Sequence, residues 1–204
     1  MTARIPTSPE SVLAAAGVTL EAIVSPARSQ EIDRAIEHAR RRDAASRAWV
    51  PDVLLDSYEA GTLAGPVDEI RKASIRAKLI IVHGPNDTGK AAAAVVCLLD
   101  GEHPGGRYVR ASMLAREMLS KDRYEHEQAA ECRAASRLVV VEMGRESPEW
   151  TRPALDSMLT ERISRGRLTV VTVSSEVVPK WSAFVRLYPE LASIPPRERR
   201  TVRT

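Results

Sequence analysis

A glycine-bearing segment at residues 84–90 holds the residues whose types and spacing most clearly predict chemistry. It reads Gly-Pro-Asn-Asp-Thr-Gly-Lys, which satisfies the GxxxxGK pattern of a phosphate-binding loop. Gly84 and Gly89 would let the backbone curl so that its amides point at phosphate oxygens, and Lys90 would supply a cation. A glycine turn with a purely structural role is the alternative. The expected nucleotide-binding residues are Gly84, Asn86, Asp87, Thr88, Gly89, Lys90 and Ala91.

Two positions of this loop depart from the usual chemistry. The residue after the lysine is normally Ser or Thr, whose hydroxyl coordinates Mg²⁺, but here it is Ala91, which has no side-chain oxygen. Asp87 places a carboxylate inside a loop that should attract anions, which costs electrostatic energy unless Lys90 or Thr88 neutralises it. We therefore expect phosphate binding to be retained and Mg²⁺ coordination to be weak or absent.

A second acidic position follows the apolar run at residues 138–141. In P-loop ATPases of the additional-strand kind, this strand usually ends in Asp, which holds Mg²⁺ through water, and Glu, which polarises the attacking water. Here the pair is Glu142 and Met143. Glu142 is the candidate catalytic and metal-binding residue, with an ordinary exposed carboxylate at a strand end as the alternative. Met143 cannot accept a proton, so we expect hydrolysis to be impaired.

The elements that would position these residues alternate between strands and helices. Short apolar runs predict strands at 78–83, 107–110, 138–141 and 168–173. Periodic segments predict helices at 67–77, 91–100, 112–119, 121–135, 147–166 and 181–187. Such alternation predicts an α/β fold with a mostly parallel sheet and helices on both faces. The loop, Glu142 and the serines after the fourth strand, Ser174 and Ser175, would then lie at the carboxyl ends of the strands.

The N-terminal part of the chain has a different character. Between residues 28 and 49, apolar residues recur at three- and four-residue spacing among charges, which predicts an amphipathic helix with a weak apolar stripe. Gly61, Gly65 and Pro66 then interrupt the periodicity. We therefore divide the chain into a helical segment, 1–60, that is a candidate for partner binding, and a P-loop domain, 61–204.

Composition limits the classes of function. With 44% hydrophobic and 28% charged residues the chain should fold, and with 4% aromatic residues it offers few platforms for stacking single-stranded bases. The net charge is +3, with arginines clustered at 40–42 and 197–203. These clusters permit contact with nucleic acid, although a solvated helix face and a loose tail would show the same charge pattern. No apolar run approaches a membrane span of ~18 residues, so we expect a cytoplasmic protein.

Four stretches carry a resemblance to a known family: 84–90, 108–114, 138–144, and 159–175 with Arg162 and Arg165. In order and spacing they resemble the AAA+ ATPase domain of DnaC-type helicase loaders and IstB-type transposition ATP-binding proteins, over residues 66–190. The resemblance implies a three-layer P-loop NTPase core behind an N-terminal helical segment. It places Glu142 at the metal acid, Met143 at the catalytic glutamate, and Ser174 or Ser175 at the residue that senses the γ-phosphate.

The resemblance also implies ligands and partners. The cofactors would be ATP and Mg²⁺, and the partners a replicative helicase or a transposase-like protein, single-stranded DNA, and further copies of the chain. The sequence departs from the family near its C-terminus, where the fifth core strand and the later arginine elements are expected to be short, divergent or missing. Arg186 is a weak candidate for an arginine that acts on a neighbouring subunit's nucleotide.

A phosphate-binding loop of this kind leaves three functions open. The first is a helicase-loader-like ATP-binding protein of DNA replication or transposition, which hydrolyses ATP poorly or not at all. The second is a degenerate P-loop scaffold that binds a protein partner without a nucleotide cycle. The third, a small-molecule kinase, lacks support because no lid-like arginine cluster lies between the third and fourth predicted strands.

Overall fold

The computed structural model describes residues 26–100, 105–146 and 149–204, and the chain divides into two compact units, 1–42 and 43–204. The described part of the first unit lies in helix α3 (Pro26–Arg47), whose last residues belong to the second unit. Ile32 and Ile36 on this helix are exposed, which agrees with the weak apolar stripe. Arg41 and Glu37 form an ion pair of 3.0 Å across one helical turn. A functional boundary near residue 60 stays a prediction.

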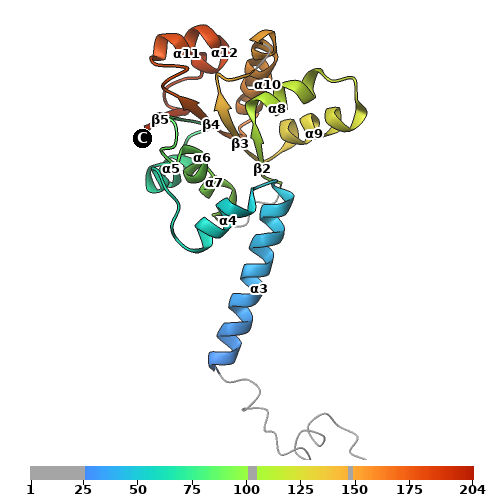
Figure 1. Cartoon of the computed structure of the whole chain (residues 1–204), viewed down its shortest axis with the longest axis vertical. Coiled ribbons are helices and arrows are strands. Elements are labelled where there is room, and N and C mark those ends of the chain that lie inside the picture. The colour runs from blue at the N-terminus through green and yellow to red at the C-terminus, as the bar shows by residue number, and fades with distance from the viewer. Residues whose placement is uncertain (1–25, 101–104, 147–148) are drawn as a thin grey trace, which may run out of the picture. The chain divides into compact units, whose positions relative to one another are not determined.

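A parallel sheet of five strands forms the centre of the second unit, in the order β2-β3-β4-β1-β5 (Figure 1). The strands are β1 (Leu79–Gly84), β2 (Arg107–Arg110), β3 (Arg137–Met143), β4 (Leu168–Ser174) and β5 (Arg199–Arg203). Residues of β1, β3 and β4 are almost all buried because both faces of the sheet are covered, which is why these strands are continuous apolar runs in the sequence. The predicted α/β fold with a parallel sheet is confirmed.

Strand β5 is the element that the sequence predicted to be short, divergent or missing. It is present, has five residues and pairs in parallel with β1, from Leu79 opposite Arg199 to His83 opposite Arg203. Its sequence, Arg-Arg-Thr-Val-Arg, has Val202 as its one buried residue. A strand at the edge of a sheet needs little apolar surface, so composition alone did not reveal it.

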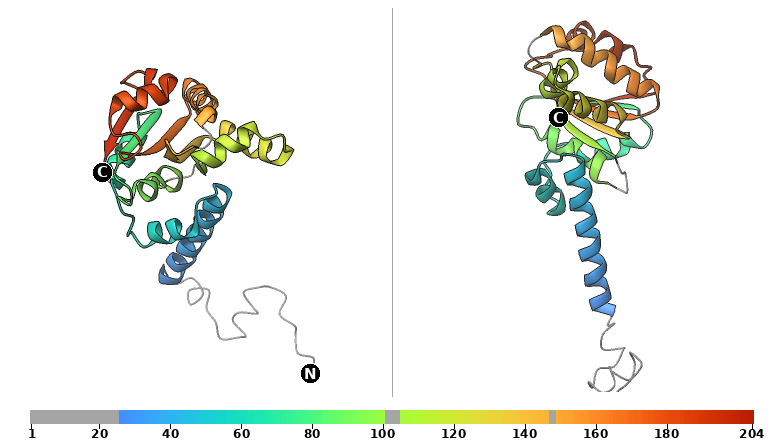
Figure 2. Two further views of the ribbon diagram at one scale, coloured as in Figure 1. Left: turned by 45° about the horizontal axis from the view of Figure 1, so that its top comes forward. Right: turned by 90° about the vertical axis from the view of Figure 1, so that its right-hand side faces the viewer.

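Helices cover both faces of the sheet and complete three layers, which is easiest to follow in the two views of Figure 2. One face carries α8 (Ala111–Leu119), α9 (Arg123–Ala134), α10 (Arg152–Ser164), α11 (Trp181–Leu187) and α12 (Pro189–Ser193). The other carries α4 (Asp52–Glu59), α5 (Val67–Ser74), α6 (Lys90–Ala94) and α7 (Val96–Leu99). A 3₁₀ turn (Glu149–Thr151) precedes α10. Within the described residues, no helix has the length and apolar character needed to cross a membrane.

Both cysteines are buried as free thiols, Cys97 on the α7 side of the sheet and Cys132 on the α9 side. Burial raises the pKa of each thiol to about 12. At pH 8 we therefore expect both to react with iodoacetamide about 10³-fold more slowly in the native protein than in urea, because the thiolate is the reactive form. Peptide mass spectrometry measures the rates, and modification of either cysteine at the unfolded rate in buffer would contradict the burial described here.

Candidate phosphate-binding site

The glycine-bearing loop joins the carboxyl end of β1 to the start of α6, as predicted. Gly89 caps α6 in the left-handed region, with φ of 74°. A Cβ at Gly89 would lie 2.5 Å from the carbonyl carbon of Ala64, and a Cβ at Gly65 would lie 2.7 Å from the carbonyl oxygen of Gly89. The two backbones thus approach too closely for any side chain at either glycine. The segment before α5 therefore supports the loop from outside.

Lys90 is the first residue of α6, and its side chain turns back into the loop. Its Nζ donates to the carbonyl oxygen of Gly84 at 3.0 Å and also to that of Pro85. The side chain is largely buried, and burial lowers the pKa of the amine, while the carboxylates of Glu176 and Asp87 oppose that shift. The structure thus holds a cation among the loop carbonyls, at the place where the sequence predicted one.

The remaining loop side chains have distinct surroundings. Asp87 is exposed and adopts a left-handed backbone with φ of 56°, and its carboxylate favours the charged form of Lys90. Thr88 donates its hydroxyl to the carbonyl oxygen of Pro85 at 3.0 Å and lies 2.7 Å from the hydroxyl of Thr204. The Thr88 hydroxyl is therefore used within the loop, and the carboxylate of Asp87 acts on the charge of Lys90.

Glu176 is a carboxylate at the loop that sequence reasoning missed. It accepts a hydrogen bond from Asn86 Nδ2, and its carboxylate lies 3.8 Å from the guanidinium of Arg145. Its position two residues beyond β4 was the signal that could have found it, because the carboxyl ends of neighbouring parallel strands meet at one edge of the sheet. Together with Asp87, it gives the loop two carboxylates near Lys90.

The two serines at the end of β4 lie beside the loop. Ser174 is buried, and its Oγ accepts a hydrogen bond from the backbone amide of Glu176 at 3.2 Å. The backbone amide of Ser175 donates to the carbonyl oxygen of Gly84 at 2.8 Å. Since β4 lies between β1 and β3, these bonds fix the end of β4 directly against the loop. A γ-phosphate-sensing role for either serine stays a prediction.

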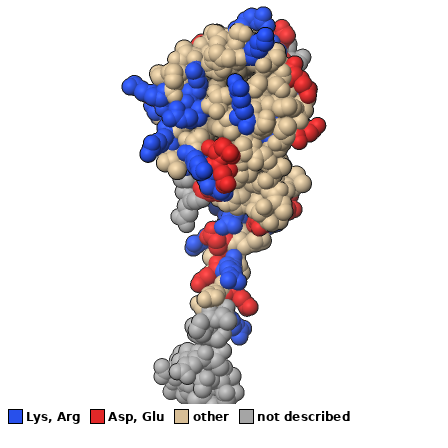
Figure 3. All heavy atoms as spheres, turned by 90° about the vertical axis from the view of Figure 1, so that its left-hand side faces the viewer, with Lys and Arg blue, Asp and Glu red and all other residues tan. Residues whose placement is uncertain are grey.

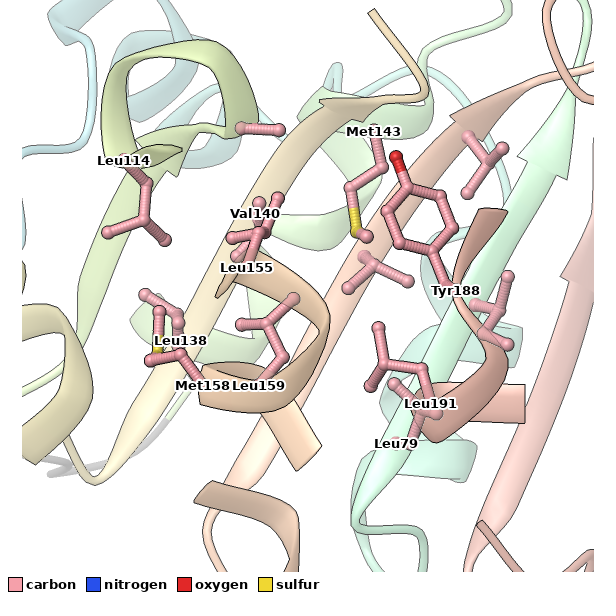
Figure 4. Packing of buried hydrophobic residues seen from close by; sticks show 14 of the residues in the cluster. Leu79, Leu114, Leu138, Val140, Met143, Leu155, Met158, Leu159, Tyr188 and Leu191 are labelled. Atoms are coloured by element: carbon pink, nitrogen blue, oxygen red, sulfur yellow. The ribbon is translucent and has the colours of Figure 1, made fainter. Parts of the chain in front are cut away.

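The end of β3 has a local irregularity that separates its two candidate residues. The pairing with β4 shifts register between Val140 and Met143, and Glu142 takes a left-handed backbone with φ of 63°. Such a bulge places an extra residue in one strand and changes which face the next side chain meets. Met143 consequently packs in the same buried cluster as Leu138 and Val140 (Figure 4). Glu142, in contrast, is exposed.

Glu142 is held through its backbone, because its amide donates to Thr172 Oγ1 of β4 at 3.1 Å. Its carboxylate favours the neutral form of Tyr108, whose pKa is raised chiefly by burial, so it lies toward β2. The groups that influence the amine of Lys90 are Glu176, Asp87 and Arg145. The structure therefore brings Glu176, more than Glu142, to the lysine.

One ligand of the Mg²⁺ site that the family resemblance implies is missing, and weak Mg²⁺ coordination stays a prediction. Ala91 stands in the first turn of α6 without an oxygen to offer. Across the described ranges, no three His, Cys, Asp or Glu side chains come together in a way that could hold a metal ion. The loop amides and Lys90, in contrast, suit an anion such as a phosphate group.

The arginines singled out in the sequence have separate structural settings. Arg162 is fully buried, and its guanidinium donates to backbone carbonyls at the end of α9. Arg165 is exposed and pairs with Glu161 at 2.6 Å, and Arg186 on α11 is also exposed. Arg162 therefore serves the C-terminal end of α9 and not that of its own helix.

No protein-family model matches the chain, and no curated protein matches its sequence. Among solved structures, the crystal structure of DnaI is similar, with 15% sequence identity and a TM-score of 0.48. That alignment covers 67% of this chain and 81% of the DnaI chain. A likeness at this level says nothing about function, so the function of this protein has to be inferred from its own residues.

Proposed function

We propose that this protein binds ATP through residues 84–90 and acts in a helicase-loader-like role in DNA replication or transposition, with slow or no hydrolysis. The observation that carries the proposal is the side chain of Lys90, held against the carbonyl oxygens of Gly84 and Pro85 at the start of α6. A cation folded into a glycine-bearing loop between a parallel strand and a helix suits the outer phosphates of a nucleotide.

Binding would exchange one set of oxygen contacts for another. Lys90 would leave the loop carbonyls for phosphate oxygens, and the backbone amides of the loop would donate to the same phosphates. The carboxylates of Asp87 and Glu176 oppose an anion at this position. We therefore expect weaker affinity than a loop without acidic side chains would give.

Hydrolysis would be slow because two groups that assist it are replaced. Ala91 cannot coordinate Mg²⁺, and Met143 can neither accept a proton nor reach solvent from the core. The loss of a metal contact or of a general base typically costs a factor of about 10² each in turnover. Bound ATP would then act as a switch or a structural ligand rather than as a substrate for hydrolysis.

The helicase-loader-like part of the proposal rests on the order and spacing of the sequence stretches between residues 66 and 190. In this role residues 1–60 would bind a replicative helicase or a transposase-like protein. The P-loop domain would contact single-stranded DNA and further copies of the chain. Residues 1–25 of that segment lie outside the described residues.

Replacement of Lys90 by alanine is expected to weaken ATP binding by about 10²-fold, because it removes a buried, charge-assisted contact to phosphate. Isothermal titration of ATP, with and without Mg²⁺, into wild-type protein and Lys90→Ala measures the effect. Lys121→Ala serves as the matched control, since Lys121 is an exposed lysine in the turn between α8 and α9. Equal, weak binding by wild type and Lys90→Ala would sink the proposal.

A degenerate P-loop scaffold without a nucleotide cycle is the second candidate. Thr204 favours it, because its hydroxyl contacts Thr88 and lies where a Cβ of Gly84 would be, so part of the loop is already packed against protein. The same titration separates the two functions, since a scaffold would bind no ATP. Robust Mg²⁺-dependent ATP turnover by the pure protein would exclude both this scaffold and the slow hydrolysis proposed above.

A further inference from the structure

Strand β5 exposes one edge of the sheet. The backbone carbonyl of Glu198 accepts from Leu79, and the amide of Thr204 donates to His83 at 3.1 Å, so the even-numbered residues of this strand face β1. In a parallel pair every second residue turns its N–H and C=O groups away from the neighbour. The backbone groups of Thr201 and Arg203 therefore point outward, and among the hydrogen bonds of the described residues none satisfies them.

The charge of this edge is positive. Arg200 and Arg203 are exposed, and Arg200 donates to the backbone carbonyl of Pro196. The carboxylate just before the strand, Glu198, is paired with Lys78 at 3.2 Å. Figure 3, which views the side where Figure 1 places β5, shows Lys and Arg side chains gathered on this face. Such an edge repels a second copy of itself and attracts an acidic strand.

A cavity of about 420 Å³ lies over β1 and β5 on the α11 side of the sheet. Ile81, Val178, Trp181 and Phe184 form its apolar wall, and the rings of Trp181 and Phe184 stack at 5.1 Å. Lys180 and Arg203 are among its lining residues, and none of the lining residues is acidic.

The cavity extends to the exposed edge. Thr201 and Arg203 of β5 line it and share this face of the sheet with Ile81 and His83 of β1. Side chains alternate between faces along a strand, so a strand added beside β5 would turn every second side chain toward the cavity. The edge thus offers backbone pairing and a place for an apolar side chain at once.

We propose that β5 accepts an extended, acidic segment of a partner protein as a sixth strand, with an apolar side chain of that segment in the cavity beside Trp181. Backbone pairing with Thr201 and Arg203 supplies affinity, and the cavity together with the arginines selects an apolar residue between acidic ones. Gly84 and Pro85 of the phosphate loop also line this cavity, whereas Lys90 does not.

The probe is a fluorescent nine-residue peptide with phenylalanine at its centre. Glutamate flanks the phenylalanine on both sides, and threonine and glutamate alternate beyond it. Fluorescence anisotropy measures its binding to the full chain. Thr201→Pro removes the outward N–H but no hydrogen bond to β1. We expect Thr201→Pro and Arg203→Glu each to weaken binding at least about tenfold, and the matched control Thr201→Val to bind within about twofold of wild type. Thermal melting checks that the variants fold.

Peptide controls keep the test independent of the variants' stability. A peptide methylated on alternate backbone amides and a peptide with lysine for glutamate are both expected not to bind. Equal binding of the methylated peptide, wild-type affinity of Thr201→Pro, or no saturation at millimolar peptide would overturn the proposal. A single-stranded oligonucleotide that loses affinity with Arg203→Glu, but not with Thr201→Pro, and displaces the peptide would assign the surface to nucleic acid. Peptide binding is measured without nucleotide, so this result stands apart from the nucleotide titration.

Discussion

Met143→Glu is expected to destabilise the fold by about 3 kcal/mol or more and to leave ATP hydrolysis at the wild-type level. The substitution restores the residue type that the family resemblance places here. However, the side chain of Met143 is fully buried on the α10 side of the sheet, in the cluster that also contains Tyr188 (Figure 4). A carboxylate at this position would lose its hydration inside an apolar cluster, so it would be neutralised or would destabilise its surroundings.

Urea denaturation of wild type, Met143→Glu and Met143→Leu measures this effect. The leucine variant keeps an apolar side chain of similar volume, and its expected cost is below about 1.5 kcal/mol. Phosphate release assays on the same samples report hydrolysis. A glutamate variant with normal stability and raised Mg²⁺-dependent turnover would show that this side chain reaches the phosphate loop, contrary to the bulge at Glu142.

Arg162→Met is expected to cost about 3 kcal/mol or more of stability, although methionine fills much of the same volume. The guanidinium Nη1 shares its two hydrogens among the carbonyl oxygens of Cys132 at 2.5 Å, Arg133 at 2.7 Å and Ala135 at 2.9 Å. These carbonyls close the C-terminal end of α9, where helices leave acceptors without partners. A methionine would remove the bonds to Cys132 and Ala135, while Arg167 still donates to Arg133.

A control for this prediction lies one turn farther along the same helix. Arg165 is exposed and pairs with Glu161, and Arg165→Met should change stability by at most about 0.5 kcal/mol because surface ion pairs contribute little. Arg162→Lys keeps a charge but not the planar fork, so its loss should be intermediate. Burial lowers the pKa of Arg162 to about 10, and the group stays charged at pH 7. Equal losses for Arg162→Met and Arg165→Met in thermal unfolding would refute the capping role.

Much of the fold could be predicted from sequence because its central strands are buried on both faces. The runs at 107–110, 138–141 and 168–173 lie within strands, and the run at 78–83 begins one residue before β1. The loop at Gly84 was predictable for the same reason, since glycine spacing and the flanking elements agreed. Strand β5 was not, because a single buried valine among arginines has no apolar signature.

Which side chains face the site was harder to predict than the position of the site in the fold. Glu142 takes a backbone conformation that costs a non-glycine residue energy, and the resulting shift sends Met143 into the core. No local pattern signals such a bulge, because it depends on pairing with β4. Glu176 was missed for a related reason, since its contact with Asn86 joins residues 90 positions apart.

Thr204 follows β5 directly and lies against the phosphate loop, with its hydroxyl 2.7 Å from that of Thr88. Its backbone amide also donates to His83, the residue just before Gly84. Thr204 therefore connects the end of β5 directly to the phosphate loop. A nucleotide that moved Thr88 and a partner that moved β5 would be thermodynamically linked, and each would change the affinity of the other by the same factor.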